Sequence, residues 1–213
     1  MTQVRTVDGR VAGRRGQATR ARLLECLGEL LASTSYRDVT VIDVARQAGT
    51  SPATFYQYFP DIQTAVVELA NEVLKESSTL RDLAAEQSWA GRSGGAAAAA
   101  LVDGFLDFWR QHGAILRVVD LAAAEGDRRF ARIRMKLLNS VVGALSDAIA
   151  ELQRGGRVDA EVHATATAGA LVTMLAASAA HTKAFDTWSV KDDELRSGLT
   201  RLVAWGVTGR KPS

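Results

Sequence analysis

Uncharged hydrogen-bonding side chains are concentrated in one short run of the chain, SPATFYQYF at residues 51–59. The hydroxyl and amide groups of this run belong to Thr54, Tyr56, Gln57 and Tyr58. Groups of this kind form hydrogen bonds with base edges and phosphate oxygens in nucleic acid. The residue types therefore indicate polar recognition in a groove, provided that the chain presents them on a slim and exposed element.

Two short helices are predicted to position this run. In the first, apolar residues recur at helical spacing, and Thr40 and Asp43 stand where an N-cap and an N3 carboxylate belong. Gly49 can adopt the positive φ that closes this helix, and Ser51 and Pro52 occupy the N-cap and first position of the second. A helix, a tight turn and a second helix place one helix in the major groove of DNA.

Two aromatic residues four positions apart, Phe55 and Phe59, are expected to face inward as anchors of the second helix. A helical hairpin stabilised only by aromatic packing would show the same spacing. The spacing by itself leaves both interpretations open.

The segment 49–61, GTSPATFYQYFPD, closely resembles the recognition helix of the TetR/AcrR family of transcriptional repressors. Within that family it is most similar to the branch of the ethionamide-resistance repressor. The resemblance covers about residues 18–74 and includes Arg20, Leu23, Leu24, Leu27, Leu30, Leu31, Tyr36, Val39, Thr40 and Val41. One position departs from the family pattern, because Asp61, Ile62 and Gln63 stand where the family usually has a basic residue that contacts phosphate.

The resemblance implies that some of the DNA-contacting residues bind bases and that others bind phosphates. Contacts with base edges or thymine methyl groups are expected from Pro52, Ala53, Thr54 and Gln57. Contacts mainly with phosphates are expected from Thr40, Thr50, Ser51, Tyr56 and Tyr58.

The N-terminal segment is basic, and we expect it to supply the missing phosphate contact. The whole chain has a net charge of +2, whereas residues 1–60 contain eight Arg and five acidic residues. We expect DNA contacts from Arg14, Arg15 and Arg20, and a flexible arm over residues 1–17. A disordered, solubilising tail has the same composition, and an arm that orders on DNA satisfies both interpretations.

Composition and periodicity predict an all-α protein of about nine helices, with only three prolines and 47% hydrophobic residues. We expect a three-helix DNA-binding head at residues 18–60 and a ligand-binding and dimerisation bundle at residues 61–213. Helices of this bundle are predicted at about 61–86, 96–112, 114–124, 127–154, 160–185 and 191–207, with a loop at 87–95.

The small-residue run at 164–180, paired with the last helix, resembles the four-helix dimer interface of the family. The expected interface residues are Ala164, Ala168, Leu171, Val172, Leu175, Leu199, Leu202 and Val203. An interior helix of a monomer suits the same composition. The resemblance favours a homodimer, because paired half-sites require a two-fold axis.

Aromatic and thioether side chains in the bundle predict a pocket for a small lipophilic effector. The candidates are Phe105, Phe108, Trp109, Phe130, Met135, Leu138 and Met174, with His112 and Asn139 as polar partners. Aromatic residues at helical spacing are more often ordinary core, and a filled core without a ligand is the alternative.

Enzymatic and metal-binding chemistry finds little support in the sequence. None of the three histidines has a metal-binding spacing, and the chain has no nucleophile elbow and no P-loop. We expect no cofactor, no metal and no membrane partner, and the single Cys26 suits a cytoplasmic location. The expected function is a ligand-responsive repressor that binds palindromic operator DNA as a dimer. An activator of the same fold, or a helical carrier or enzyme that does not read DNA, remains the alternative.

Overall fold

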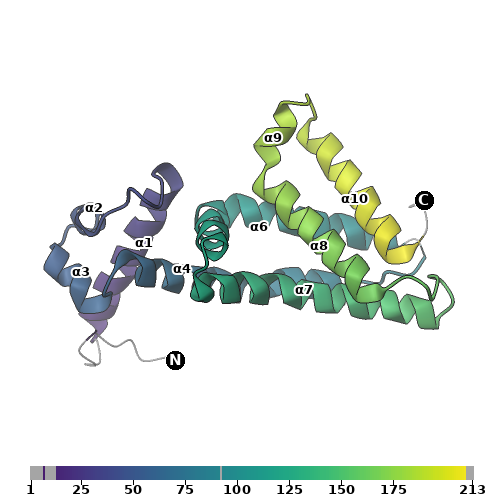
Figure 1. Cartoon of the computed structure of the whole chain (residues 1–213), viewed down its shortest axis with the longest axis horizontal. Coiled ribbons are helices and arrows are strands. Elements are labelled where there is room, and N and C mark those ends of the chain that lie inside the picture. Colours follow the sequence, from purple (N-terminus) through teal and green to yellow (C-terminus); the bar gives the residue numbers. More distant parts are fainter. Residues whose placement is uncertain (1–6, 8–12, 92, 210–213) are drawn as a thin grey trace. The chain divides into compact units, whose positions relative to one another are not determined.

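The computed structural model describes residues 7, 13–91 and 93–209, which form ten helices and no strands (Figure 1). Contacts divide the chain into two compact units, each described separately below. The first unit contains residues 1–73 and 114–133, and the second contains residues 74–113 and 134–213. The predicted all-α fold class is therefore confirmed for the described residues.

The first unit is built on three helices that pack on one another, α1 (Arg14–Ser33), α2 (Val41–Gln47) and α3 (Pro52–Tyr58) (Figure 1). Its core contains leucines of α1, Val44 and Ala45 of α2, and Phe55 and Phe59 from α3 and its C-cap. The first part of α4 (Ile62–Glu76) and residues 114–133 complete the unit. Because α1 begins at Arg14, residues 14–17 are helical rather than part of a flexible arm.

The second unit is a bundle formed by the end of α4, most of α6 and α7, and four further helices. Its elements are α5 (Ser78–Ala85), α6 (Ser93–Ala124), α7 (Arg128–Arg154), α8 (Ala164–Ala180), α9 (Thr182–Asp186) and α10 (Asp192–Thr208). Helices α8 and α10 pack side by side (Figure 1). Gly206 permits this close approach, because a Cβ there would lie 2.8 Å from a Leu171 methyl group.

Three predicted helix boundaries differ from the structure. The single helix expected at 61–86 is divided at Ser77, which is buried and donates its hydroxyl to the Leu74 carbonyl. The two helices expected at 96–112 and 114–124 form one continuous α6, because Gly113 does not interrupt it. The helix expected at 160–185 begins at Ala164 and is divided at His181 into α8 and α9.

Candidate nucleic-acid interface

Helix α3 has one buried side and one exposed, uncharged side. Phe55 and Phe59 are fully buried, with ring centroids 5.3 Å apart, and so fix the helix to the core as predicted. On the other side Tyr56 is 52% exposed, and Gln57 is exposed beside it. The slim N-terminal turn, formed by Ser51, Pro52 and Ala53, is exposed as well. This arrangement can approach a nucleic-acid groove without removing a charge from water.

The start of α2 forms the capping box that the sequence predicts. The Thr40 hydroxyl accepts a hydrogen bond from the Asp43 backbone N–H at 3.3 Å and also contacts the Asp43 carboxylate at 2.6 Å. The carboxylate accepts in turn from the Thr40 backbone N–H at 3.3 Å. These hydrogen bonds, with a smaller contribution from the Arg46 charge, lower the pKa of Asp43. The hydroxyl of Thr40, an expected phosphate contact, is therefore already hydrogen-bonded.

The turn into α3 also has the predicted geometry. Gly49 has a φ of +67°, a conformation that side-chain-bearing residues rarely adopt. Ser51 caps α3, because its hydroxyl accepts from the Thr54 backbone N–H at 3.2 Å. The Ser51 and Thr54 hydroxyls lie 3.1 Å apart, and Thr50 donates to the Ser51 carbonyl. Thr50, Thr54 and Tyr58 are all half-buried, whereas Ser51 is exposed.

The expected arginines have two different environments. Arg14 and Arg15 are exposed in the first turn of α1, where the structure has no acidic residue and Gly13 supplies no side-chain cap. Arg20 instead lies over the Phe59 ring, 5.1 Å from its centroid, and forms an ion pair with Glu68. Burial lowers the pKa of Arg20, and this contact anchors α3 and α4 to α1.

One residue of the N-terminal segment is described outside α1. The Val7 backbone N–H donates to the Gln57 carbonyl at 2.8 Å, which places this residue at the end of α3. Sequence reasoning gave no signal for this contact, because it is made by the backbone. The other basic positions of the expected arm, Arg5 and Arg10, lie outside the described residues.

Asp61, which departs from the family pattern, has a structural role. Its carboxylate accepts a hydrogen bond from the Thr64 backbone N–H at 2.6 Å, at the start of α4. A carboxylate at this position also interacts favourably with the helix dipole. Asp61 therefore caps the start of α4.

A polar cluster links the α1–α2 connection to the turn between α6 and α7 within the first unit. Arg37 forms an ion pair with Glu125, 88 positions away in the sequence. Arg129 donates to Gln63 at 3.2 Å and pairs with Asp127 at 2.7 Å. Tyr36 hydrogen-bonds with Gln63, and burial raises the pKa of its phenol. The sequence shows no local pattern that would have predicted this cluster.

Comparison with known proteins identifies this arrangement. The family model described as "Bacterial regulatory proteins, tetR family" matches residues 24–69, and "Tetracyclin repressor-like, C-terminal domain" matches residues 80–213. The chain belongs to the TetR family. It is a transcriptional regulator of the DNA-binding helix-turn-helix type, and its relatives are regulators rather than enzymes.

The TetR-family relatives agree with this assignment. The HTH-type transcriptional regulator EthR of Mycolicibacterium smegmatis is 33% identical over 86 residues, which is 40% of each chain. The fatty acid degradation regulator FadR of Bacillus halodurans has a TM-score of 0.65 at 14% identity, covering 93% of this chain and 97% of its own. Bacillus subtilis FadR, solved in complex with stearoyl-CoA, has a TM-score of 0.65 at 13% identity and covers 89% and 98%.

The expected effector residues of this TetR-family chain do not form one group. Phe105, Phe108 and Trp109 are buried together on α6, and His112 is nearly buried beside them. Met135 is 58% exposed and Asn139 is also exposed, so both face solvent on α7. The remaining candidates are Phe130, which is buried in the first unit, and Leu138 and Met174, which are half-buried in the second.

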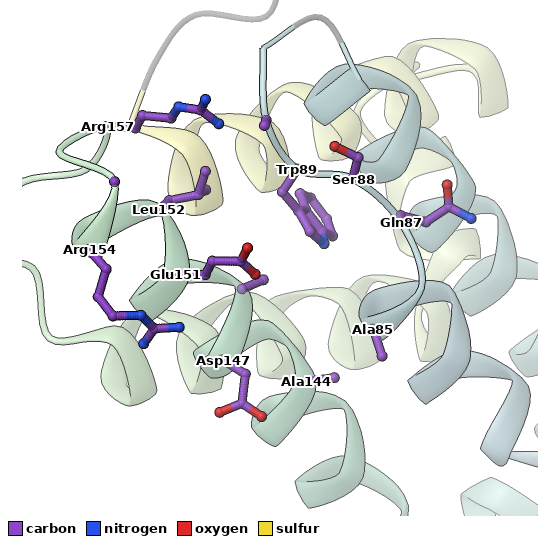
Figure 2. Close-up of a pocket in the computed structure, with 13 residues that line it drawn as sticks. Ala85, Gln87, Ser88, Trp89, Ala144, Asp147, Glu151, Leu152, Arg154 and Arg157 are labelled. Atoms are coloured by element: carbon purple, nitrogen blue, oxygen red, sulfur yellow. The ribbon is translucent and has the colours of Figure 1, made fainter.

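An open cavity of about 560 Å³ lies elsewhere in the second unit, between the α5–α6 connection and the last turns of α7 (Figure 2). Trp89 forms part of its wall, and Asp147, Glu151 and Arg154 of α7 line the opposite side. None of the expected effector residues lines this cavity. Its lining mixes Trp89, Leu152 and alanines with charged side chains, and so differs from the apolar pocket that the sequence predicts.

Six of the eight expected dimer residues are buried in the core of a single chain. These residues are Ala168, Leu171, Val172, Leu175, Leu199 and Val203. Leu202 is 46% exposed and Ala164 is half-buried. The exposed stripe of α8 consists instead of small residues, Ala166, Ala170, Thr173 and Ala177, and that of α10 contains Gly198, Leu202 and Trp205. Of the eight expected residues, Leu202 is the one that belongs to an exposed stripe.

Two further properties concern residues 13–91 and 93–209. They contain no group of three or more His, Cys, Asp or Glu side chains arranged to hold a metal ion. None of their helices combines the length and the apolar character that a membrane span requires.

Proposed function

We propose that this protein is a ligand-responsive transcriptional repressor that binds a palindromic operator as a homodimer. The observation that carries the proposal is the exposed and uncharged face of α3, fixed to the core by Phe55 and Phe59. A helix with slim, polar side chains at its N-terminal end suits insertion into the major groove. The two halves of a palindrome would receive the two copies of this helix.

The exposure of individual side chains supports a division between base and phosphate contacts. Gln57 and the slim Pro52–Ala53 turn face outward and would read base edges and thymine methyl groups, with the half-buried Thr54 behind them. Tyr56, Ser51, Thr50 and Tyr58 would bind phosphates around the groove. Thr40, which is exposed, would add a phosphate contact while its hydroxyl remains in the capping box.

The first turn of α1 would supply the phosphate contact that Asp61 does not make. Cations are electrostatically unfavourable at a helix N-terminus, and yet Arg14 and Arg15 occupy this turn without an acidic partner among the described residues. A phosphate placed there would accept from the free backbone N–H groups and pair with both arginines. Arg20 would act mainly by holding α3 against α1.

We propose the exposed stripes of α8 and α10 as the homodimer interface. Small residues at Ala166, Ala170 and Thr173 allow close approach of a second helix, and Leu202 and Trp205 add apolar area. The expected residues Leu171, Val172 and Leu175 would support this interface from within each chain.

We propose that a small lipophilic effector binds the aromatic residues of α6 and releases the operator. Bacillus subtilis FadR, which shares the fold, was solved with stearoyl-CoA, and the acyl chain of that molecule supports an effector with a long apolar part. Helices α4 and α6 each contribute residues to both units, so a ligand that shifts either helix would act on the DNA-binding head. A coupling of about 1–3 kcal/mol would weaken operator binding roughly 5- to 150-fold.

Selection of bound sequences from random duplex DNA at near-physiological salt tests the proposal. We expect a palindrome, and we expect Gln57→Ala to relax the preference at one position in each half-site with a loss of about 1–3 kcal/mol. The matched control is Gln111→Ala, which truncates an exposed glutamine of α6 in the other unit. Recovery of no motif, with binding lost at modest salt, would contradict sequence-specific recognition.

A further inference from the structure

The indole N–H of Trp109 is a buried hydrogen-bond donor without an acceptor in the described part of the chain. Trp109 lies on α6 and is only 7% exposed, and its Nε1 atom has no hydrogen-bond partner there. Buried polar groups in folded proteins almost always have a partner, and an unpaired donor costs stability. This donor is the only buried side-chain nitrogen or oxygen of the described residues in that condition.

The surroundings of Trp109 are aromatic rather than polar. The Phe105 ring stacks on it with centroids 5.5 Å apart and an interplanar angle of 12°, and the Phe108 ring meets it edge-on at 5.7 Å. His112 follows one turn later, 4.7 Å from Phe108, and its Nε2 atom lies 3.2 Å from the Glu76 carboxylate. His112, the polar side chain of this aromatic group, is thus already paired with another residue.

The other buried tryptophan provides the contrast. Trp89 is 5% exposed, and its Nε1–H donates to the Ala84 carbonyl at 2.9 Å in a buried hydrogen bond. Both indoles belong to the second unit and have similar burial. The fold therefore satisfies one indole donor and leaves the other unpaired among aromatic rings.

We propose that the Trp109 N–H binds and orients the effector, and that the effector is an apolar molecule carrying a neutral carbonyl oxygen. This inference rests on the ligand-responsive part of the proposed function. The rings of Phe105 and Phe108 would contact the apolar body, and the indole would donate to the oxygen.

The charge state of the ligand follows from the residues around the donor. A carboxylate buried beside Trp109 would need a cation. The basic side chains that follow Trp109 on α6 are already engaged, because the exposed Arg110 pairs with Asp107 and His112 faces Glu76. A ketone, ester, thioester or amide oxygen accepts a hydrogen bond without this requirement. The site therefore selects a neutral carbonyl compound over the free fatty acid of the same length.

Matched pairs of probes test the assignment directly. Each pair contains a ketone and the hydrocarbon in which CH₂ replaces C=O: benzylacetone with butylbenzene, and methyl nonyl ketone with undecane. We expect Trp109→Phe to weaken ketone binding about three- to tenfold, the range that one neutral hydrogen bond supplies, and to leave hydrocarbon binding unchanged. The matched control is Trp89→Phe, which makes the same exchange at a paired indole and should not change the preference for the ketone.

A second readout uses the wild-type chain. The indole ¹H–¹⁵N resonance that disappears in Trp109→Phe belongs to Trp109, and we expect the ketones to shift it downfield while the hydrocarbons do not. An unshifted resonance, ketone binding that is equal in both proteins, or no binding of either ketone would overturn the proposal. Binding of the ligand-free wild-type and Trp109→Phe proteins to the selected duplex DNA distinguishes a failure of the effector proposal from a failure of the repressor proposal. If neither protein binds DNA, the repressor proposal fails independently of the probe results.

Discussion

The guanidinium of Arg20 lies 5.1 Å from the centroid of the Phe59 ring and is paired with Glu68. This contact joins α1 to the end of α3 and to α4, so the charge of Arg20 is used within the DNA-binding head. Arg14 and Arg15, six and five positions earlier on the same helix, are exposed. The arginines of one helix thus occupy two environments, one paired and partly buried and the other exposed.

Replacing these arginines separates the two environments. We expect Arg20→Gln to lower the free energy of unfolding by about 1 kcal/mol through loss of the cation–π contact and the ion pair. We expect Arg15→Gln to leave stability unchanged and to reduce the slope of log K against log [salt] for DNA binding by about one. Denaturant unfolding and salt titrations of DNA binding measure both effects. A reduced slope for Arg20→Gln with full stability would assign Arg20 to a phosphate instead.

Adjacent aromatic residues of α3 should respond in opposite ways to truncation. Phe55 is fully buried, so Phe55→Ala should cost about 3–5 kcal/mol of stability through lost burial and a cavity. Tyr56 is half exposed, so Tyr56→Ala should change stability by less than about 1 kcal/mol and weaken DNA binding. Thermal unfolding and a DNA-binding titration distinguish the two roles. Full DNA binding by Tyr56→Ala would count against α3 as the recognition helix.

The α2 capping box predicts a pH dependence with a definite sign. The folded protein lowers the pKa of Asp43, mainly through its hydrogen bond with Thr40. The ionised form is therefore favoured by folding, and its contribution is present above the ordinary carboxyl pKa and is lost as pH falls through the lower folded value. We expect the stability advantage of wild type over Asp43→Asn to disappear in acid. An advantage that is constant from neutral pH to acid would exclude this linkage.

The capping hydroxyl can be tested independently of pH. Thr40→Ala should cost about 1 kcal/mol, whereas Thr40→Ser should retain most of the stability because it keeps the hydroxyl. Denaturant unfolding at neutral pH measures the difference. Equal losses in the two variants would show that the methyl group of Thr40, rather than its hydroxyl, stabilises the start of α2.

The proposed dimer interface predicts that a charge on the exposed stripe of α8 separates the protomers. Ala170→Asp should weaken dimerisation by about 2 kcal/mol or more, which is roughly thirtyfold in Kd. Met135→Asp places the same charge on an exposed site of α7 and serves as the control. Sedimentation velocity over a dilution series measures the association. Dissociation by the control, or none by Ala170→Asp, would place the interface elsewhere.

The helix-turn-helix head could be predicted from the sequence because its determinants are local. The Thr40–Asp43 capping box, the positive φ of Gly49, the Ser51 cap and the buried Phe55–Phe59 pair all involve residues within four positions of one another. Interactions at this range recur whenever the sequence recurs. The family resemblance depends on the same residues, and it was confirmed together with the all-α fold class.

The tertiary structure decided the features in which local signals are weak or conflicting. Gly113 has low helix propensity, which costs about 1 kcal/mol relative to alanine. Buried residues on both sides of it, among them Trp109 and Leu116, stabilise the helix by more than this cost and keep α6 continuous. The side chains of α8 are mostly small and apolar on every side of the helix, so hydrophobic periodicity could not predict which face would be buried. The sequence by itself therefore determined the DNA-binding motif, because short-range hydrogen bonds and caps specify it. Only long-range packing decided which faces remain exposed, how Arg37 meets Glu125, and why the Trp109 donor stays unpaired.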